Sequence, residues 1–234
     1  MPIITKTIGH DIGGVTFELL AAWDDAQAVV RPAVLVAGTF MGRTDFEDEK
    51  AKALAASGYV GVAIDFYGVG TKPSDVASAS AAMAVLNDDR ALLKARMIGS
   101  LAAVRAIDAP VDASKVAAIG FCFGGKCVLD LARAGADVLG VASFHGVYDA
   151  PPFANAPITA RALILDGWDD TLCPPDAKRA LASELSQAGV DWQLHSYGHT
   201  GHAFTNPKRP EMYRPVVATR SWQALGNFLE ELFA

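Results

Sequence analysis

The chain has 234 residues and a formal net charge of −6, and 51% of its residues are hydrophobic. This length suits one domain with a sizeable core, so the whole of 1–234 is expected to form a single domain. Binding to nucleic acid needs clustered Lys and Arg, and the basic residues here are scattered. Nucleic acid is therefore not an expected partner.

The N-terminus lacks the basic and apolar regions of a signal peptide. Every apolar stretch is interrupted well short of the ~18 residues that a membrane span needs. The three cysteines, Cys122, Cys127 and Cys173, have neither the number of a disulfide framework nor the spacing of a structural zinc site. These features predict a cytoplasmic protein without a membrane anchor, in which a thiol can stay reduced.

Short β-branched runs alternate with longer helical patterns along the chain, which is typical of an α/β fold. Such alternation predicts a mostly parallel central sheet flanked by helices on both faces. In chain order, the expected elements are an antiparallel hairpin of 2–8 and 13–22, strand 33–37, helix 46–57, strand 60–65, a loop with one short helix over 68–87, helix 88–107, a turn at 112–115, strand 116–120, a helix from there to 134, strands 138–144 and 162–167, helix 176–188, strand 191–197 and helix 217–233.

The run Gly120-Phe121-Cys122-Phe123-Gly124-Gly125 follows a predicted strand and precedes a helical pattern. It is the cysteine form of the Gly-x-Ser-x-Gly elbow, which carries the nucleophile of α/β-hydrolases. The nucleophile occupies a strained turn, and the flanking glycines let strand and helix approach each other. The helix N-terminus also stabilises a thiolate. The motif therefore predicts Cys122 as the nucleophile of an α/β-hydrolase.

Two other interpretations of this run compete with the nucleophile. A free cysteine is more often a small buried apolar residue, and Gly-rich turns between strand and helix also bind phosphates. Three glycines at elbow spacing after a strand favour the nucleophile over both. Cys127, within the following helix, is expected in the core, and Cys173, in a loop, is expected beside the pocket without a catalytic role.

A catalytic acid and a histidine should follow the nucleophile in that order in this fold. The predicted strand 162–167 leads into a turn that offers Asp166, Asp169 and Asp170. Asp166 still belongs to the strand end, and Asp169 is expected to face water or cap the turn. Asp170 is therefore the predicted acid, with Pro174 stiffening its loop.

The predicted base lies among His195, His199 and His202, between the last strand and the last helix. His202 is the first candidate and His199 the second, whereas His195 lies within a strand and is expected to be structural. Clustered histidines also suggest a metal site, but no carboxylate or cysteine accompanies them at ligand spacing. Neither a metal nor a cofactor is therefore expected.

Four segments, three of them around the predicted triad, form one combined pattern. They are Gly120–Gly125, Asp170-x-x-x-Pro174, Gly201-His202-x-Phe204 and Asp65-Phe66-Tyr67-Gly68. The combination resembles the dienelactone hydrolase family over about residues 30–232. The resemblance implies an α/β-hydrolase fold with a Cys-His-Asp triad at Cys122, His202 and Asp170. It also implies hydrolysis of lactones or small esters through a thiol-ester acyl-enzyme, without metal or cofactor.

The chain departs from the family pattern at two places. Members that act on dienelactone have a Glu beside the resting thiol, where this chain has Thr39. They also hold the substrate carboxylate with Ser and Arg just after the histidine, where this chain has Ala203 and Asn206. Dienelactone itself is therefore not the expected substrate. Three arginines offer a replacement charge, although surface solvation is the expected role of each: Arg43, Arg90 and Arg96.

In the mechanism that these residues predict, the Cys122 thiolate attacks the carbonyl and His202 transfers the protons. Backbone N–H groups of Phe123 and of the Thr39-Phe40 loop are expected to hold the oxyanion. The expected partner is a small-molecule ester or lactone, and the protein is expected to be a monomer or homodimer. Four residues are candidate walls of the substrate pocket: Tyr67, His145, Trp168 and Phe204.

Two rival functions remain to be compared with this one. Glutamine amidotransferases share the Gly-x-Cys-x-Gly turn but pair it with His-x-Glu, whereas Ala203 and Phe204 follow His202 here. A binding protein that keeps the fold and has lost its chemistry is the second rival. Candidates for all three triad positions argue against it.

Overall fold

The computed structural model describes residues 2–26 and 29–234. Within these ranges it contains eight strands and six helices. The chain divides into two compact units, residues 1–118 and residues 119–234, and strand β5 (Val111–Phe121) runs through the boundary. The single domain expected over 1–234 stays a prediction.

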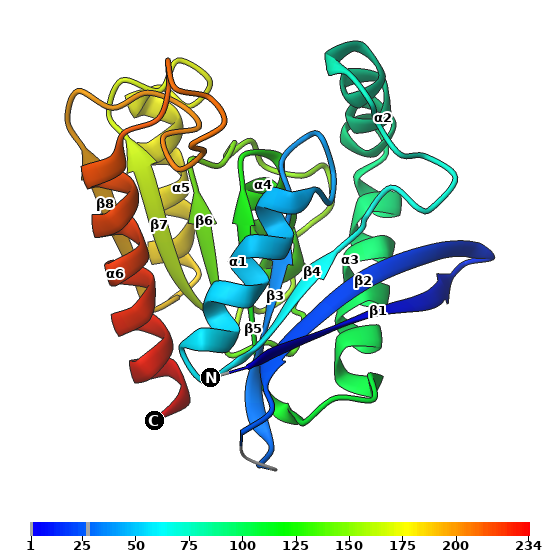
Figure 1. Ribbon diagram of the computed structural model, residues 1–234. Helices are drawn as coiled ribbons and strands as arrows, with labels where there is room; N and C mark the ends of the chain where they lie inside the picture. Colours follow the sequence, from blue (N-terminus) through cyan, green and yellow to red (C-terminus); the bar gives the residue numbers. More distant parts are fainter. Residues whose placement is uncertain (1, 27–28) are drawn as a thin grey trace. The chain divides into compact units, whose positions relative to one another are not determined.

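The first unit begins with the expected antiparallel hairpin, formed by β1 (Ile3–Ile12) and β2 (Val15–Asp24) (Figure 1). Gly13 and Gly14 connect the two strands with φ values of +59° and +81°. A two-residue turn of this kind requires positive φ at both positions, which glycine adopts without strain. The hairpin is therefore specified by its turn.

The remaining strands of the first unit are β3 (Arg31–Ala37) and β4 (Val60–Ile64). Strand β4 pairs antiparallel with β2 and parallel with β3, which gives the order β1-β2-β4-β3. Both β3 and β4 are almost wholly buried. This burial explains their continuous apolar sequences, because helices cover both faces of a parallel sheet.

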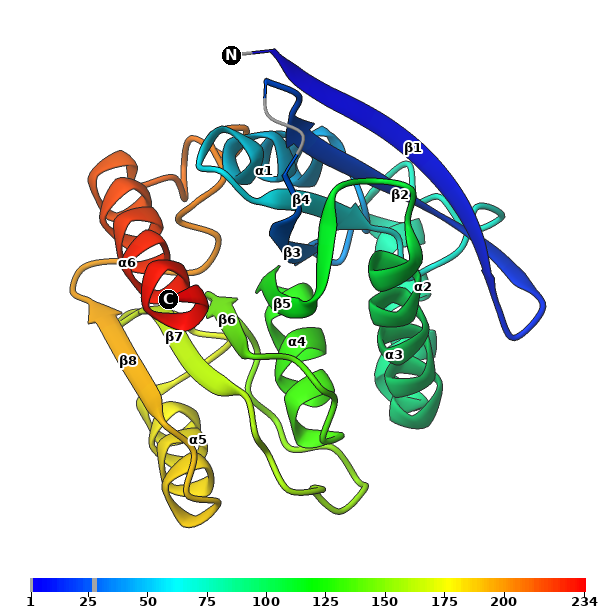
Figure 2. The ribbon, with the colours of Figure 1, turned by 90° about the horizontal axis from the view of Figure 1, so that it is seen from below.

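Helix α1 (Asp45–Ala56) packs on β4, β2 and β3, and α3 (Arg90–Ala106) lies on the opposite face (Figure 2). A capping box between Thr44 and Glu47 starts α1. The expectation for 68–87 was wrong in extent, because α2 (Val76–Asp88) is a full helix of 13 residues. Its Asp75 cap closes a second capping box, and the alanine-rich segment has high helix propensity.

In the second unit, β6 (Gly140–Phe144), β7 (Arg161–Gly167) and β8 (Trp192–Tyr197) pair in parallel, as expected. Helix α6 covers one face of these strands, and α4 and α5 cover the other (Figure 2). The bounds of the helices are Phe123–Arg133 for α4, Pro175–Gln187 for α5 and Pro215–Phe233 for α6.

The turn expected at 112–115 is wrong, because β5 already begins at Val111. The Asp112 carboxylate does accept hydrogen bonds from the backbone N–H and the hydroxyl of Ser114, at 3.0 and 2.6 Å. These contacts are typical of a turn, but here they form within an extended chain. Among the helices that the structure describes, none combines the length and the hydropathy that a membrane crossing requires.

Candidate active site

Cys122 lies between the last residue of β5 and the first residue of α4, with φ +56° and ψ −115°. Its backbone N–H donates to the Phe144 carbonyl at 3.0 Å, and its carbonyl accepts from Gly125 N at 3.0 Å. These bonds hold a turn that a non-glycine residue adopts only under strain. The side chain is partly exposed, whereas Cys127 and Cys173 are buried. The turn thus presents one thiol at the carboxyl end of a strand.

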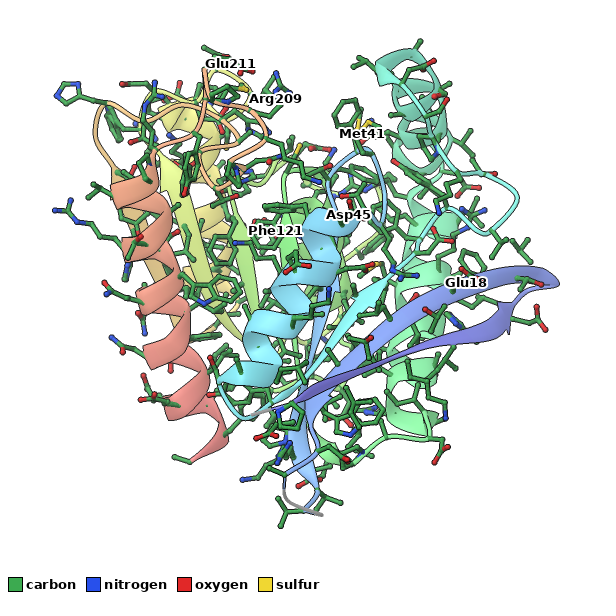
Figure 3. All side chains as sticks on the ribbon, viewed as in Figure 1. Glu18, Met41, Asp45, Phe121, Arg209 and Glu211 are labelled. Atoms are coloured by element: carbon green, nitrogen blue, oxygen red, sulfur yellow. The ribbon has the colours of Figure 1, made fainter. Side chains whose placement is uncertain are left out.

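The glycines of the elbow are required by close backbone contacts. A Cβ on Gly120 would lie 2.0 Å from the Gly124 carbonyl oxygen, and one on Gly125 would lie 2.5 Å from Ser143 Oγ. Both distances are below any real Cβ contact, so a side chain at either place would displace the turn. Phe121, the end of β5, is labelled in Figure 3. The structure therefore gives each of these two glycines a steric reason.

The structure brings the predicted base and acid together. Nδ1 of His202 lies 2.7 Å from Oδ2 of Asp170, and the two side chains are 10% and 0% exposed. The other carboxylate oxygen, Oδ1, accepts from the backbone N–H of Leu172 at 2.9 Å. The second ring nitrogen, Nε2, is buried and has no hydrogen bond of standard geometry. Asp170 thus directs Nε2 away from itself.

The electrostatics of this pair favour a positively charged imidazole. Burial lowers the pKa of His202, but hydrogen bonds and charges of Asp170 and Cys122 outweigh it and raise the pKa to about 10. Two acidic groups therefore stabilise the imidazolium: Asp170, in the loop after β7, and Cys122, at the elbow. Such an arrangement suits a thiol that reacts as an anion beside a protonated histidine.

The other candidates for acid and base lie elsewhere. Asp166 is 0% exposed and forms an ion pair with Lys178 at 2.7 Å, and Asp169 is exposed, as expected. His199 is exposed, and His195 lies within β8. Among these candidates, His202 and Asp170 are the pair within hydrogen-bond distance of each other. This contact favours them over the other aspartates and histidines as acid and base.

Backbone strain concentrates around this site. Among the residues that the structure describes, the non-glycine residues with positive φ are Cys122, His145, His199 and Ala203, at +56°, +37°, +54° and +56°. All four lie in the second unit, at the elbow, just after β6, or in the loop after β8. Strain of this kind persists where the surrounding structure over-determines it, most often at functional sites. It marks the same loops that carry Cys122 and His202.

The His145 ring packs against the imidazole of His202, and Phe204 packs against His145. The His145 ring lies 5.1 Å from the His202 ring in an edge-on arrangement, and Phe204 lies 5.2 Å from His145. His145 Nε2 lies 2.8 Å from the hydroxyl of Thr205, a residue for which the sequence offered no signal. His145 and Phe204 are 1% and 0% exposed. His145 thus contacts His202 directly and Phe204 supports His145, and the predicted contact of both with substrate stays a prediction.

The other predicted wall and oxyanion residues divide between the units. In the second unit, Trp168 is 52% exposed, and Phe123 opens helix α4. In the first unit, Tyr67 donates its hydroxyl to the Phe40 carbonyl at 2.8 Å, and the Thr39 N–H points at the buried carboxylate of Glu47 at 3.3 Å. Burial raises the pKa of Glu47, against its hydrogen bonds. The roles of Tyr67, Thr39 and Phe40 toward a substrate stay predictions.

The three arginines considered as replacement charges are engaged within the first unit, and surface solvation does not describe them. Arg43 makes two hydrogen bonds to Asp48, at 2.7 and 3.1 Å. Arg96 donates to the carbonyls of Phe66 and Tyr67 at 2.9 and 3.1 Å. Arg90 is only 4% exposed.

The loop after His202 shows a similar pattern in the second unit. Asn206 uses its side-chain oxygen to accept from Lys208 N at 2.9 Å. Arg209 pairs with Glu211 at 2.9 Å, and Figure 3 labels both residues ahead of α6. The position after His202 is Ala203, which has no polar group.

Within residues 2–26 and 29–234, no group of three or more His, Cys, Asp or Glu side chains is arranged to hold a metal ion.

Known proteins with similar sequence place the chain in a family. The sequence profile of the dienelactone hydrolase family matches residues 19–233. A protein of Bradyrhizobium sp. named "Probable 2-oxo-3-(5-oxofuran-2-ylidene)propanoate lactonase" is 29% identical over 205 residues, which are 82% of this chain and 80% of that one. The family match thus extends over nearly the whole chain and includes Cys122, Asp170 and His202.

Solved structures extend the likeness to the fold. A dienelactone hydrolase-like promiscuous phosphotriesterase from metagenomic libraries has a TM-score of 0.92 and 33% identity, and 98% of each chain is covered. A dienelactone hydrolase from Anabaena variabilis has a TM-score of 0.74 at 18% identity, with 98% of each chain covered, and supports the fold alone. The α/β-hydrolase fold expected from the sequence is confirmed. The chain therefore belongs to the dienelactone hydrolase family and is a hydrolase of the carboxylic ester and lactone class.

Proposed function

We propose that Cys122, His202 and Asp170 form a catalytic triad that hydrolyses a lactone or small carboxylic ester through a thiol-ester intermediate. The observation that carries this proposal is the 2.7 Å contact between His202 Nδ1 and Asp170. It leaves Nε2 as the proton carrier, in a ring whose pKa is raised by the Cys122 side chain as well as by Asp170. Nucleophile, acid and base thus stand in the chain order of this fold.

In the first half of the reaction, the Cys122 thiolate attacks the carbonyl carbon and forms a tetrahedral oxyanion. The N–H of Phe123, at the start of α4, is the proposed donor to this oxyanion. The carbon–oxygen bond then breaks, and Nε2 of the His202 imidazolium protonates the leaving alkoxide.

In the second half, the neutral imidazole of His202 takes a proton from water. The hydroxide attacks the thiol-ester carbonyl, the carbon–sulfur bond breaks, and the carboxylic acid leaves with Cys122 restored as a thiolate. In a lactone, the alcohol released in the first half stays attached to the acyl group. No cofactor enters the balance.

The residues after His202 narrow the substrate class. A substrate carboxylate needs a donor or a cation, whereas Ala203 has no polar group and the Arg209 guanidinium is paired with Glu211. We therefore propose an uncharged lactone or ester as the substrate. Uncharged lactones of five and six ring atoms should give a higher kcat/KM than a lactone of equal size that carries a carboxylate. Equal or higher values for the carboxylate would contradict this assignment.

The triad is tested by the three cysteines, which provide matched variants. Cys122→Ala should lower kcat on a p-nitrophenyl ester by at least about 10³-fold, whereas Cys127→Ala, at a buried position, should keep it. Iodoacetamide should modify Cys122 alone, read by peptide mass, with activity lost in proportion. Full activity in Cys122→Ala would refute the mechanism. A folded protein with no activity on any ester or lactone would favour the rival binding protein.

A second substrate class is suggested by the metagenomic phosphotriesterase, which is 33% identical to this chain. The same thiolate would attack phosphorus and expel an aryloxide, and water would then release the phosphodiester. Activity on a p-nitrophenyl phosphotriester that disappears in Cys122→Ala would support it. Multiple turnovers must be observed, because a single burst equal to the enzyme concentration would mean that the thiol is only trapped.

A further inference from the structure

A buried lysine underlies the loop that carries Asp170. Lys178 lies in α5 and is 4% exposed. Its Nζ contacts Asp166 Oδ2 at 2.7 Å, the Gly167 carbonyl oxygen at 2.7 Å and the Trp168 carbonyl oxygen at 3.1 Å. An ammonium group has three N–H donors, and these contacts supply three acceptors on three consecutive residues. The two carbonyl contacts are hydrogen bonds, and the contact with Asp166 is an ion pair.

The three acceptors lie on residues two to four positions before the catalytic acid. The Gly167 carbonyl, which Lys178 contacts, also accepts from the backbone N–H of Asp170 at 3.1 Å. The ammonium further lies 5.4 Å from the centre of the exposed Trp168 ring. Lys178 therefore holds the start of the turn, and the Gly167 carbonyl links that start to Asp170. A buried ammonium is retained only where it is paired and hydrogen-bonded, so this position is built for the cation.

The charges around Lys178 all belong to the second unit. Asp166 and Asp170 are both buried carboxylates, at 0% and 2% exposed. Burial raises the pKa of Asp166 to about 6, Lys178 acts against this rise, and Asp170 adds to it. Cys173 and Tyr148 also face the two carboxylates, and their pKa values are raised first by burial and then by those charges. His202, on the far side of Asp170, carries the opposite charge.

We propose that Lys178 is a positioning residue for the catalytic acid: it clamps the backbone carbonyls of Gly167 and Trp168 so that Asp170 faces His202, and it cancels the charge of Asp166. The inference rests on the proposed function of Asp170. Through this clamp, the single net negative charge of the buried cluster lies at Asp170, where the imidazolium needs it. Without the lysine, the turn loses the contact shared by Gly167 and the charge of Asp166 loses its partner.

The test separates the clamp from the charge. Lys178→Met removes the contacts with the two carbonyls and also the positive charge that pairs with Asp166. The double variant Asp166→Asn with Lys178→Met also removes the carboxylate that would otherwise be left unpaired. We expect the double variant to recover most of the thermal stability that Lys178→Met loses. Its kcat should stay on the order of 10²-fold below the unmodified enzyme with KM within about twofold, because the acid is misplaced rather than the pocket changed.

Two further variants complete the comparison. Arg179→Met, at the next position of α5, removes an exposed cation paired with Asp176 at 3.0 Å; it should leave kcat unchanged and lower the thermal stability only slightly. Lys178→Arg keeps the charge and should restore part of kcat, which keeps the test open if the methionine variants fail to fold. The direct measurement is the low-field proton resonance of the Asp170–His202 hydrogen bond, which should shift or broaden in the double variant.

The outcomes distinguish this proposal from the triad itself. A folded double variant with kcat within twofold of the unmodified enzyme and an unchanged low-field resonance would overturn the clamp. If Asp170→Asn also kept full activity, the proposed function would fall with it. If Asp170→Asn lost activity while the double variant kept full activity, the positioning role of Lys178 would be refuted and the proposed triad would stand.

Discussion

The carboxylate of Asp170 lies 2.7 Å from Nδ1 of His202, and both side chains are almost wholly removed from water. Low dielectric strengthens a charge-assisted hydrogen bond and penalises either partner left alone. The pair therefore works as one unit: the acid sets the tautomer and the orientation of the ring, and the ring neutralises the acid. The chemistry proposed for Cys122 depends on this relationship.

Asp170→Asn tests the pair directly. The amide keeps the size of the side chain and removes its charge, so the pKa of His202 should fall from about 10, and kcat should drop about 10³- to 10⁴-fold, as for other triads. NMR titration of the His202 ring and steady-state kinetics measure the two effects. Asp169→Asn, at the exposed neighbouring position, is the control and should leave both unchanged.

Gly120→Ala tests the steric argument for the elbow. The added Cβ would meet the backbone of Gly124 at 2.0 and 2.2 Å, and backbone cannot yield as a flexible side chain does. Overpacking of this kind should lower the free energy of unfolding by about 3 kcal/mol, measured by urea denaturation. Gly226→Ala in α6 meets no atom within 4 Å and should stabilise by about 0.5–1 kcal/mol. Equal effects at the two positions would contradict the argument.

Asp166 should make stability depend on pH in a defined window. Burial raises its pKa from 3.8 to about 6, so its stabilising contribution is complete below pH 3.8 and is lost as the pH rises through 6. Between pH 7 and pH 4 this carboxyl should favour the folded state by up to about 3 kcal/mol. Denaturation at several pH values measures the free energy of unfolding, and comparison with Asp166→Asn isolates the contribution of this carboxyl. A difference between the two proteins that stays constant with pH would refute it.

Arg133 should be a major source of stability for the second unit. It is 1% exposed, makes two hydrogen bonds to Glu184 at 2.8 and 2.7 Å, and pairs with the buried Asp130 at 3.2 Å. Arg133→Met should lower the free energy of unfolding by about 3–5 kcal/mol, because the carboxylate of Asp130 loses its arginine. The exposed pair of Arg179 and Asp176 provides the comparison, since Arg179→Met should cost below about 0.5 kcal/mol. Thermal unfolding of both variants decides the point.

Most of the fold was accessible from local patterns. Apolar runs predicted the hairpin and the buried strands, because this signal arises from burial. Gly13 and Gly14, which were expected within the second strand, form the turn instead. The other errors fell on the segments 68–87 and 112–115. There the local signals were weak or ambiguous: Asp75 capped a helix longer than expected, and an Asp112–Ser114 contact formed without a turn.

The elbow and the order of Cys122, Asp170 and His202 can be read from the chain alone, because a strained turn requires glycines at set positions and the fold requires that order. The contact between Asp170 and His202, and the residues that support each of them, became visible only in three dimensions. Nothing in the sequence around Lys178 distinguishes it from a lysine on the surface of a helix. Thr205 and His145 lie 60 residues apart in the chain. Burial and contact between distant segments, which no local pattern encodes, turned these residues into the support of the site.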